Sequence, residues 1–209
     1  MRFSYKPDIS VILPTFNRAS SLEKAVQSVI AQTFVNWELL VVDDGSSDKS
    51  FEIIAPFLDR FSNIRYMKHK NRKAALSRNA GIQASFGHHI TFLDSDDHYL
   101  ETHLESRMTL MEALPDVALL CGGFHCDQET FVKDCYNLDR LIDIRECILC
   151  GTIFGKRETF FALDGFRDLE YAEDTDLWER ASKLFTVTKI EEPKTYIYQR
   201  AADSITLNY

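Results

Sequence analysis

The sequence predicts an α/β fold with a mostly parallel central sheet and helices on both faces. Short apolar runs typical of buried strands alternate three times with segments of helical periodicity in the first half of the chain. Two of these runs, at residues 37–42 and 90–93, end in adjacent carboxylates. Because ligands of such sheets bind beyond the carboxyl ends of the strands, we expect both acidic clusters to lie at one edge.

Size and charge narrow the class of protein. A chain of 209 residues, 45% of them hydrophobic, can form one domain with a sizeable core, and we expect a single domain over 1–209. The net charge of −8 argues against nucleic-acid binding, since phosphate backbones attract positive surfaces.

No apolar run approaches the roughly 20 residues that span a bilayer. Because residues 1–7 lack the apolar core of a signal peptide, we expect a cytoplasmic protein.

The five cysteines indicate reduced thiols, because their number is odd and no secretion signal is present. Cys147 and Cys150 form a C-x-x-C pair, with Cys121 and Cys126 upstream. These spacings do not match a common zinc pattern. We therefore favour small, buried apolar side chains over a zinc site.

The elements of the first half follow from apolar runs and helix-start signals. We expect strands at 9–13, 37–42, 64–67 and 90–93. A capping box, Ser20-x-x-Glu23, predicts the start of the first helix. The second helix follows a cap at Ser47 or Asp48 and contains Pro56, and the third covers 74–85.

The second half is less regular. We expect helices at 100–114, 158–163 and 173–184, and strands at 117–121, 151–154, 187–190 and 195–199. Residues 124–149 mix charged and aromatic residues without a clear period, and we assign them no element.

The end of the fourth predicted strand is a candidate metal site. If the chain stays extended there, Asp94 and Asp96 point to one side, and Ser95 and Asp97 to the other. Two like charges held together favour a cation between them, and hard oxygen ligands select Mg²⁺ or Mn²⁺. The simpler interpretation is a solvated acidic turn, because Asp-x-Asp alone is a weak motif.

A second acidic cluster begins the helix predicted at 173–184. Asp174 aligns with the apolar stripe formed by Leu177, Trp178 and Ala181, so it should point inward. It could be a first-turn acid that stabilises the helix dipole, or a general base that faces a cleft. As a base, it should be kept ionised by the helix amino terminus.

Five motifs, taken in order, resemble those of the inverting glycosyltransferases of family 2, which have the GT-A fold. They are VILPTFNR at 11–18, VVDDGS at 41–46, SRNAGI at 77–82, FLDSDD at 92–97, and ED at 173–174 followed by Leu177, Trp178 and Arg180. The resemblance rests on their order and spacing and covers most of the chain. It implies a nucleotide-sugar-binding half at 1–97 and an acceptor and catalytic half at 98–209.

The resemblance also implies a role for each matching residue. The positions expected to bind the nucleotide and its sugar are Pro14, Thr15, Phe16, Asn17, Asp43, Asp44, Lys73, Arg78, Asp94 and Ser95. Asp44 or Asp43 would bind the base, and Arg78 with Lys73 would lie near the phosphates. A structural ion pair with a nearby aspartate is an equally simple explanation for Arg78. Asp96, with Asp94, would hold Mn²⁺ or Mg²⁺, and Asp174 would be the catalytic base.

The implied reaction moves one sugar from a nucleotide-diphosphate sugar, by default a UDP-sugar, to a hydroxyl of a saccharide or lipid-linked saccharide. The Gln-x-x-Arg-Trp motif of processive members is absent from the chain, which favours a non-processive enzyme. Many members also carry a histidine soon after the position of Tyr198, and residues 199–206 contain none, so a third protein ligand for the metal is not identified. Cell-surface polysaccharide or lipopolysaccharide synthesis is the expected setting, and peripheral association with the cytoplasmic face of a membrane stays open.

Two other functions are compatible with these patterns. A nucleotidyltransferase also combines such a sheet with paired acids, but it usually has a glycine-rich phosphate loop near its start, and residues 14–18 contain no glycine. A non-catalytic nucleotide-sugar-binding module would not need Asp94, Asp96 and Asp174 together.

Overall fold

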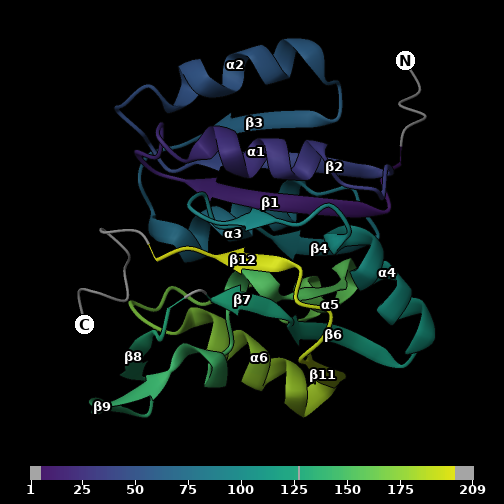
Figure 1. The fold of residues 1–209 in the computed structure, drawn as a ribbon, viewed down its shortest axis with the longest axis vertical. Coiled ribbons are helices and arrows are strands. Elements are labelled where there is room, and N and C mark those ends of the chain that lie inside the picture. The colour runs from purple at the N-terminus through teal and green to yellow at the C-terminus, as the bar shows by residue number, and fades with distance from the viewer. Residues whose placement is uncertain (1–5, 127, 201–209) are drawn as a thin grey trace.

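The computed structural model describes residues 6–126 and 128–200, and it contains one large sheet of seven strands (Figure 1). The strand order is β11-β6-β10-β4-β1-β2-β3. The strands are β1 (Ile9–Thr15), β2 (Trp37–Asp43), β3 (Ile64–Lys68), β4 (His89–Phe92), β6 (Val117–Gly122), β10 (Phe154–Lys156) and β11 (Thr186–Ile190). All neighbours pair in parallel except β10, which is antiparallel to both β4 and β6. The predicted mostly parallel α/β fold is confirmed.

Two apolar cores, one on each face, hold the helices against this sheet. The helices are α1 (Leu22–Ile30), α2 (Ser50–Arg60), α3 (Lys73–Ala84), α4 (His103–Ala113), α5 (Arg157–Ala162) and α6 (Glu173–Leu184). Alternate residues of β1 enter opposite cores: Val11 packs with α1, α2 and α4, and Ile12 packs with α3, α5 and α6. This alternation is the pleat of a strand buried on both faces.

The remaining strands build one side of the molecule beside the large sheet. β12 (Tyr196–Tyr198) pairs between β5 (His98–Tyr99) and β7 (Phe124–Cys126), and β8 (Phe131–Asp134) pairs with β9 (Asn137–Asp143) as a hairpin. In Figure 1 this hairpin lies at lower left, on the side to which the arrowheads of β1 and β3 point. The segment that showed no sequence period therefore forms strands and a 3-10 turn, η1 (Ile144–Glu146).

Three local predictions are wrong. Helix α1 begins after Ser21, without a side-chain cap, so the capping box at Ser20 does not form. Residues 151–154 are not a strand, because η2 (Cys150–Thr152) occupies most of them and β10 begins at Phe154. The chain after β4 is not extended either: Asp97 N–H donates to Asp94 C=O at 3.0 Å, which closes a turn. None of the helices in the described part of the chain has the length and apolar composition needed to cross a bilayer.

Candidate active site

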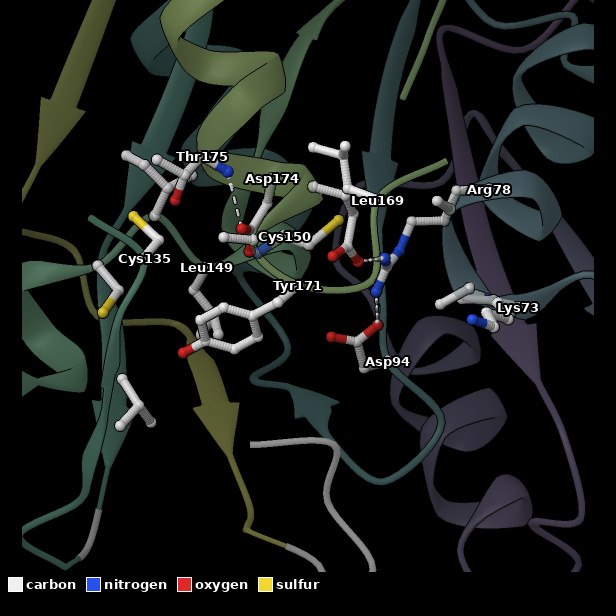
Figure 2. A pocket seen from close by; sticks show the side chains of 18 of the residues that line it. Lys73, Arg78, Asp94, Cys135, Leu149, Cys150, Leu169, Tyr171, Asp174 and Thr175 are labelled. Carbon is white, nitrogen blue, oxygen red and sulfur yellow. Dashed lines mark hydrogen bonds and ion pairs between the residues drawn. The ribbon is translucent and has the colours of Figure 1, made fainter. Parts of the chain in front are cut away.

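A cavity of about 1100 Å³ opens at the carboxyl edge of the large sheet. Its walls come from the ends of β1 and β4, the start of α3, the β8–β9 hairpin and the start of α6. Of the residues that the sequence singled out, it is lined by Pro14, Thr15, Phe16, Asn17, Asp44, Lys73, Arg78, Asp94, Ser95, Asp96 and Asp174. The two acidic motifs, 80 residues apart in the sequence, thus face one space, as Figure 2 shows for Asp94 and Asp174.

The acidic turn after β4 holds carboxylates in different environments. Asp97 is buried, where it accepts hydrogen bonds from the Tyr196 hydroxyl and from Gln199 N–H. Burial, together with the charges of Asp94 and Asp96, raises the pKa of Asp97 well above its ordinary value. The predicted alternation of sides fails because the turn reverses the chain at Ser95 and Asp96. The turn therefore brings three carboxyl groups, Asp94, Asp96 and Asp97, to the cavity wall.

Arg78 joins the two acidic motifs. Its guanidinium donates to Asp94 Oδ1 at 2.8 Å (Figure 2) and to Glu173 Oε1, on the other acidic motif, at 2.6 Å. The side chain is only 7% exposed, and its Nε has no hydrogen-bond partner among the described residues. The structural ion pair considered from the sequence is therefore present, and Arg78 also lines the cavity.

Asp174 is held by backbone groups at the start of α6. Its Oδ2 accepts from Cys150 N–H at 3.0 Å, and its Oδ1 accepts from Thr175 N–H at 2.8 Å. Burial and then the neighbouring charge of Glu173 raise the pKa of Asp174 to about 7, against the lowering effect of Arg78. The expectation that the helix amino terminus keeps this group firmly ionised is therefore wrong, because burial outweighs the dipole.

The two aspartates after β2 have different positions. Asp43 is fully buried and accepts from Ser46 N–H at 2.6 Å and from the Tyr66 hydroxyl at 2.5 Å. Burial would raise its pKa, but these hydrogen bonds and nearby Lys68 hold the pKa below its ordinary value. Asp44 lines the cavity and accepts from Arg72 N–H at 2.7 Å. The structure thus brings Asp44, and not Asp43, to the cavity wall among the described residues.

The loop after β1 supplies a wall with few charges. Asn17 has a left-handed backbone, with φ of 52°, and its side-chain oxygen accepts from Ser47 N–H at 2.8 Å, so it joins this loop to the loop after β2. Phe16 is 45% exposed at the cavity rim. The buried hydroxyl of Thr15 has no hydrogen-bond partner among the described residues.

Lys73, the first residue of α3, also lines the cavity, and its Nζ lies 3.8 Å from Glu170 Oε1.

Sequence reasoning missed several groups that shape the cavity. Glu173 was given no role from the sequence, yet it binds Arg78, and the Cys150 amide that holds Asp174 gives no side-chain signal. Tyr136 reaches from the β8–β9 hairpin to Glu179 on α6, and the Tyr171 hydroxyl donates to Lys133 C=O at 2.6 Å. Aromatic residues within the irregular segment were the only available clue. The five cysteines are free thiols: Cys121 and Cys150 are buried as expected, whereas Cys126, Cys135 and Cys147 are only partly buried.

Comparison with known proteins identifies the family. The sequence profile described as glycosyl transferase family 2 matches residues 10–157. An uncharacterised glycosyltransferase of Rickettsia prowazekii is 29% identical over 200 residues, which cover 89% of this chain and 61% of that protein. The uncharacterised glycosyltransferase YibD of Escherichia coli is 33% identical over 123 residues, or 58% of this chain and 36% of that protein. The chain therefore spans less than two thirds of these relatives.

Solved structures show the same fold at lower identity. Staphylococcus aureus TarS residues 1–349, in complex with UDP-GlcNAc, superposes with a TM-score of 0.78 at 19% identity, covering 97% of this chain and 61% of that one. A mannosyltransferase of Pyrobaculum calidifontis, in complex with GDP-Man and Mn²⁺, gives 0.76 at 18% identity, covering 97% and 59%. The architecture is that of the GT-A glycosyltransferases. Since the family profile spans most of its length, this chain belongs to glycosyl transferase family 2.

Proposed function

We propose that the protein is a metal-dependent, inverting and non-processive glycosyltransferase that moves one sugar from a nucleotide-diphosphate sugar to an acceptor hydroxyl. One observation carries the proposal: Asp174 faces the same cavity as the acidic turn, held by two backbone amides and with a pKa near 7. A general base works best when its pKa lies near the working pH. A binding module has no need for a carboxylate poised in this way.

The donor side of the proposed site is the wall formed by the loops after β1 and β2. Phe16 offers an exposed aromatic face to a base, and the Asp44 carboxylate offers a polar contact, with Pro14, Thr15 and Asn17 completing this wall. Lys73 and Arg78 would balance the charge of the diphosphate. Asp43 would act indirectly, by holding the loop that presents Asp44.

The acidic turn fits a divalent cation. Its oxygen donors are of the kind that Mg²⁺ and Mn²⁺ prefer. Burial is the main reason why the pKa of Asp97 is raised, and the charges of Asp94 and Asp96 add a repulsion that a cation would relieve. No group of three potential ligands that could hold a metal is found among the described residues, so phosphate oxygens and water would complete the coordination. Asp96 and Asp94 are the proposed ligands. Bound there, the cation would neutralise charge on the departing diphosphate. Residues 201–206, where a further ligand was sought, lie outside the described residues.

The acceptor would enter from the side of the β8–β9 hairpin and α6. In our proposal Asp174 takes the proton of the acceptor hydroxyl as that oxygen attacks the anomeric carbon, and the nucleotide diphosphate departs from the opposite face. A new carbon–oxygen bond forms as the old one breaks, which inverts the configuration. We propose a saccharide or lipid-linked saccharide acceptor used in polysaccharide or lipopolysaccharide synthesis, with a UDP-sugar as the first donor to test.

The experiment that tests the proposal is thermal unfolding with UDP, GDP, CDP and dTDP, each with and without Mn²⁺. A ligand at 100 times its dissociation constant stabilises the fold by about 2.7 kcal/mol. For a chain of this size the unfolding midpoint should then rise by roughly 5–10 °C. A rise with one nucleotide that requires Mn²⁺ supports the proposal and names the donor class. If no nucleotide raises the midpoint at saturation, the proposal fails.

A further inference from the structure

A second cavity, of about 500 Å³, lies at the opposite edge of the large sheet, near the amino ends of β1 and β4. It is lined by Lys6, Phe86, Gly87, His88, His89, Lys156, Arg157 and Glu158. None of these residues lines the active-site cavity. They include three permanent cations and one carboxylate, in a chain whose net charge is −8.

The antiparallel strand β10 brings these cations together. Lys156 is opposite His89 in the β10–β4 register, and Arg157 N–H donates to His88 C=O at 2.8 Å. A parallel β10 would have carried both cations to the other edge of the sheet. The cluster therefore lies where β4 begins and β10 ends.

Within the described part of the chain, the three cations of this cavity take part in no ion pair, although Glu158 lines the same cavity. No carboxylate of the described residues forms an ion pair with Lys6, Lys156 or Arg157. Lys156 Nζ donates to Pro115 C=O at 2.7 Å, and Arg157 Nε donates to the Ser85 hydroxyl at 3.1 Å, so both are held by neutral groups. Nearby Asp8 accepts from the Asn36 amide at 2.6 Å. Three cations against the single carboxylate of Glu158 leave a net positive charge in the cavity, and the repulsion among these cations would fall if an anion bound there.

His89 also lines this cavity. Its ring stacks on Phe154 at 5.5 Å, and its buried Nδ1 has no hydrogen-bond partner among the described residues. Buried polar atoms are nearly always hydrogen-bonded, so a buried Nδ1 without a described partner, beside three cations, suggests that a ligand supplies a hydrogen-bonding group here. A tetrahedral oxyanion could accept hydrogen bonds from both the ring and the cations.

We propose that this cavity binds a phosphate group, carried by a soluble phosphate ester or by a phospholipid head group, independently of the active site. The cavity volume exceeds that of a phosphate ion alone, so the ligand carries further groups. Exposed Phe86, which packs under Arg65 at 4.5 Å, would contact the remainder of the ligand. The inference does not depend on the proposed transferase reaction.

The direct test follows the ring signals of His88 and His89 by NMR while inorganic phosphate is added at constant ionic strength. We expect saturable shifts of these two signals and no shift of buried His103. The double variant Lys6→Gln/Arg157→Gln should weaken phosphate binding by about tenfold or more, because charge-assisted hydrogen bonds are lost. The charge-matched control Arg60→Gln/Lys183→Gln, on exposed ends of α2 and α6, should bind like the wild type.

A second experiment distinguishes a phospholipid head group from a soluble phosphate ester by sedimentation with phosphatidylcholine vesicles, with and without phosphatidylglycerol. Binding to vesicles that requires phosphatidylglycerol and is lost in the double variant indicates a head group. Saturation by phosphate in the NMR experiment without binding to vesicles indicates a soluble ester. If Arg157→Gln impairs folding, Lys6→Gln/Lys156→Gln replaces it. The proposal is overturned if His88 and His89 show no saturable shift, or if the variant and its control bind phosphate equally. Because Asp96→Asn should leave these signals unchanged, failure here would not bear on the active site.

Discussion

The two edges of the large sheet carry opposite charge. At the carboxyl edge, carboxylates of the acidic turn and of α6 surround the larger cavity, with Arg78 between them. At the amino edge, Lys6, Lys156 and Arg157 surround the smaller one. Asp174 is bound by backbone amides and Asp94 by Arg78, whereas Lys156 and Arg157 donate hydrogen bonds to neutral oxygens. The contrast teaches that net charge says little about what one edge can bind.

The largest expected effect is on turnover at the acidic edge. Replacing Asp174 with asparagine removes the proposed base but leaves the cavity shape, so turnover should fall by about 10²–10⁴. Binding of the nucleotide with Mn²⁺ should stay within about twofold of wild type, as measured by calorimetry. Undiminished turnover would remove Asp174 from the mechanism.

The next effect concerns the bridge between the two acidic motifs. Arg78→Leu leaves Asp94 and Glu173 without their shared cation, which should cost about 3 kcal/mol because breaking a buried pair strands its charges. The unfolding midpoint should fall by roughly 6–12 °C. The double variant Arg78→Leu/Glu173→Gln, which strands one charge fewer, should recover part of the loss. A midpoint within a degree of wild type would show that the bridge is not structural.

The pH profile sharpens the role of the raised pKa. Because burial and Glu173 raise the pKa of Asp174 to about 7, turnover should increase with pH up to about 7 and level off above it. Below that value the carboxyl is protonated and cannot accept the acceptor's proton. Glu173→Gln removes a raising charge, so the midpoint of the acid limb should move to lower pH. An unmoved limb in that variant would assign the titration to another group.

A smaller effect separates the two neighbouring aspartates after β2. Asp43→Asn should lower the free energy of unfolding by about 1–3 kcal/mol, since Asp43 accepts two buried hydrogen bonds. Asp44→Asn should instead weaken nucleotide binding with little loss of stability. Denaturant unfolding and calorimetry on both variants measure the two quantities. The reverse outcome would exchange their roles.

The smallest effect is expected at the β8–β9 hairpin. Tyr136 is 74% exposed and its hydroxyl bonds to Glu179 on α6. Exposed contacts with a charged partner contribute little to the free energy of unfolding, so Tyr136→Phe should change it by less than about 1 kcal/mol. Hydrogen exchange of the hairpin amides should nevertheless increase, because the hairpin loses one tie to α6. Exchange equal to wild type would mean that the tie does not restrain the hairpin.

Much of the first half could be predicted because β1 and β2 are buried on both faces and appear as continuous apolar runs. Residues 9–13 and 37–42 lie within β1 and β2, and helix α6 has the predicted bounds. The segment at 124–149 could not be predicted, since its strands are short and β9 is largely exposed, so burial leaves no period there. For the residues after β4 the sequence left both an extended segment and an acidic turn open, because a short acidic stretch does not reveal which of the two forms.

The amino-acid sequence by itself determined the α/β class, the order of most elements and the acidic residues at strand and helix ends. The periodicity of apolar residues and the alternation of strand and helix are enough to predict these features, because both are set by residues that are close together in the sequence. Only the tertiary structure decided that Arg78 joins Asp94 to Glu173, that Asp43 turns inward, and that β10 runs antiparallel and carries its cations to the amino edge. Those outcomes depend on contacts between residues far apart in the sequence, where burial and charge compete and no local pattern records the result.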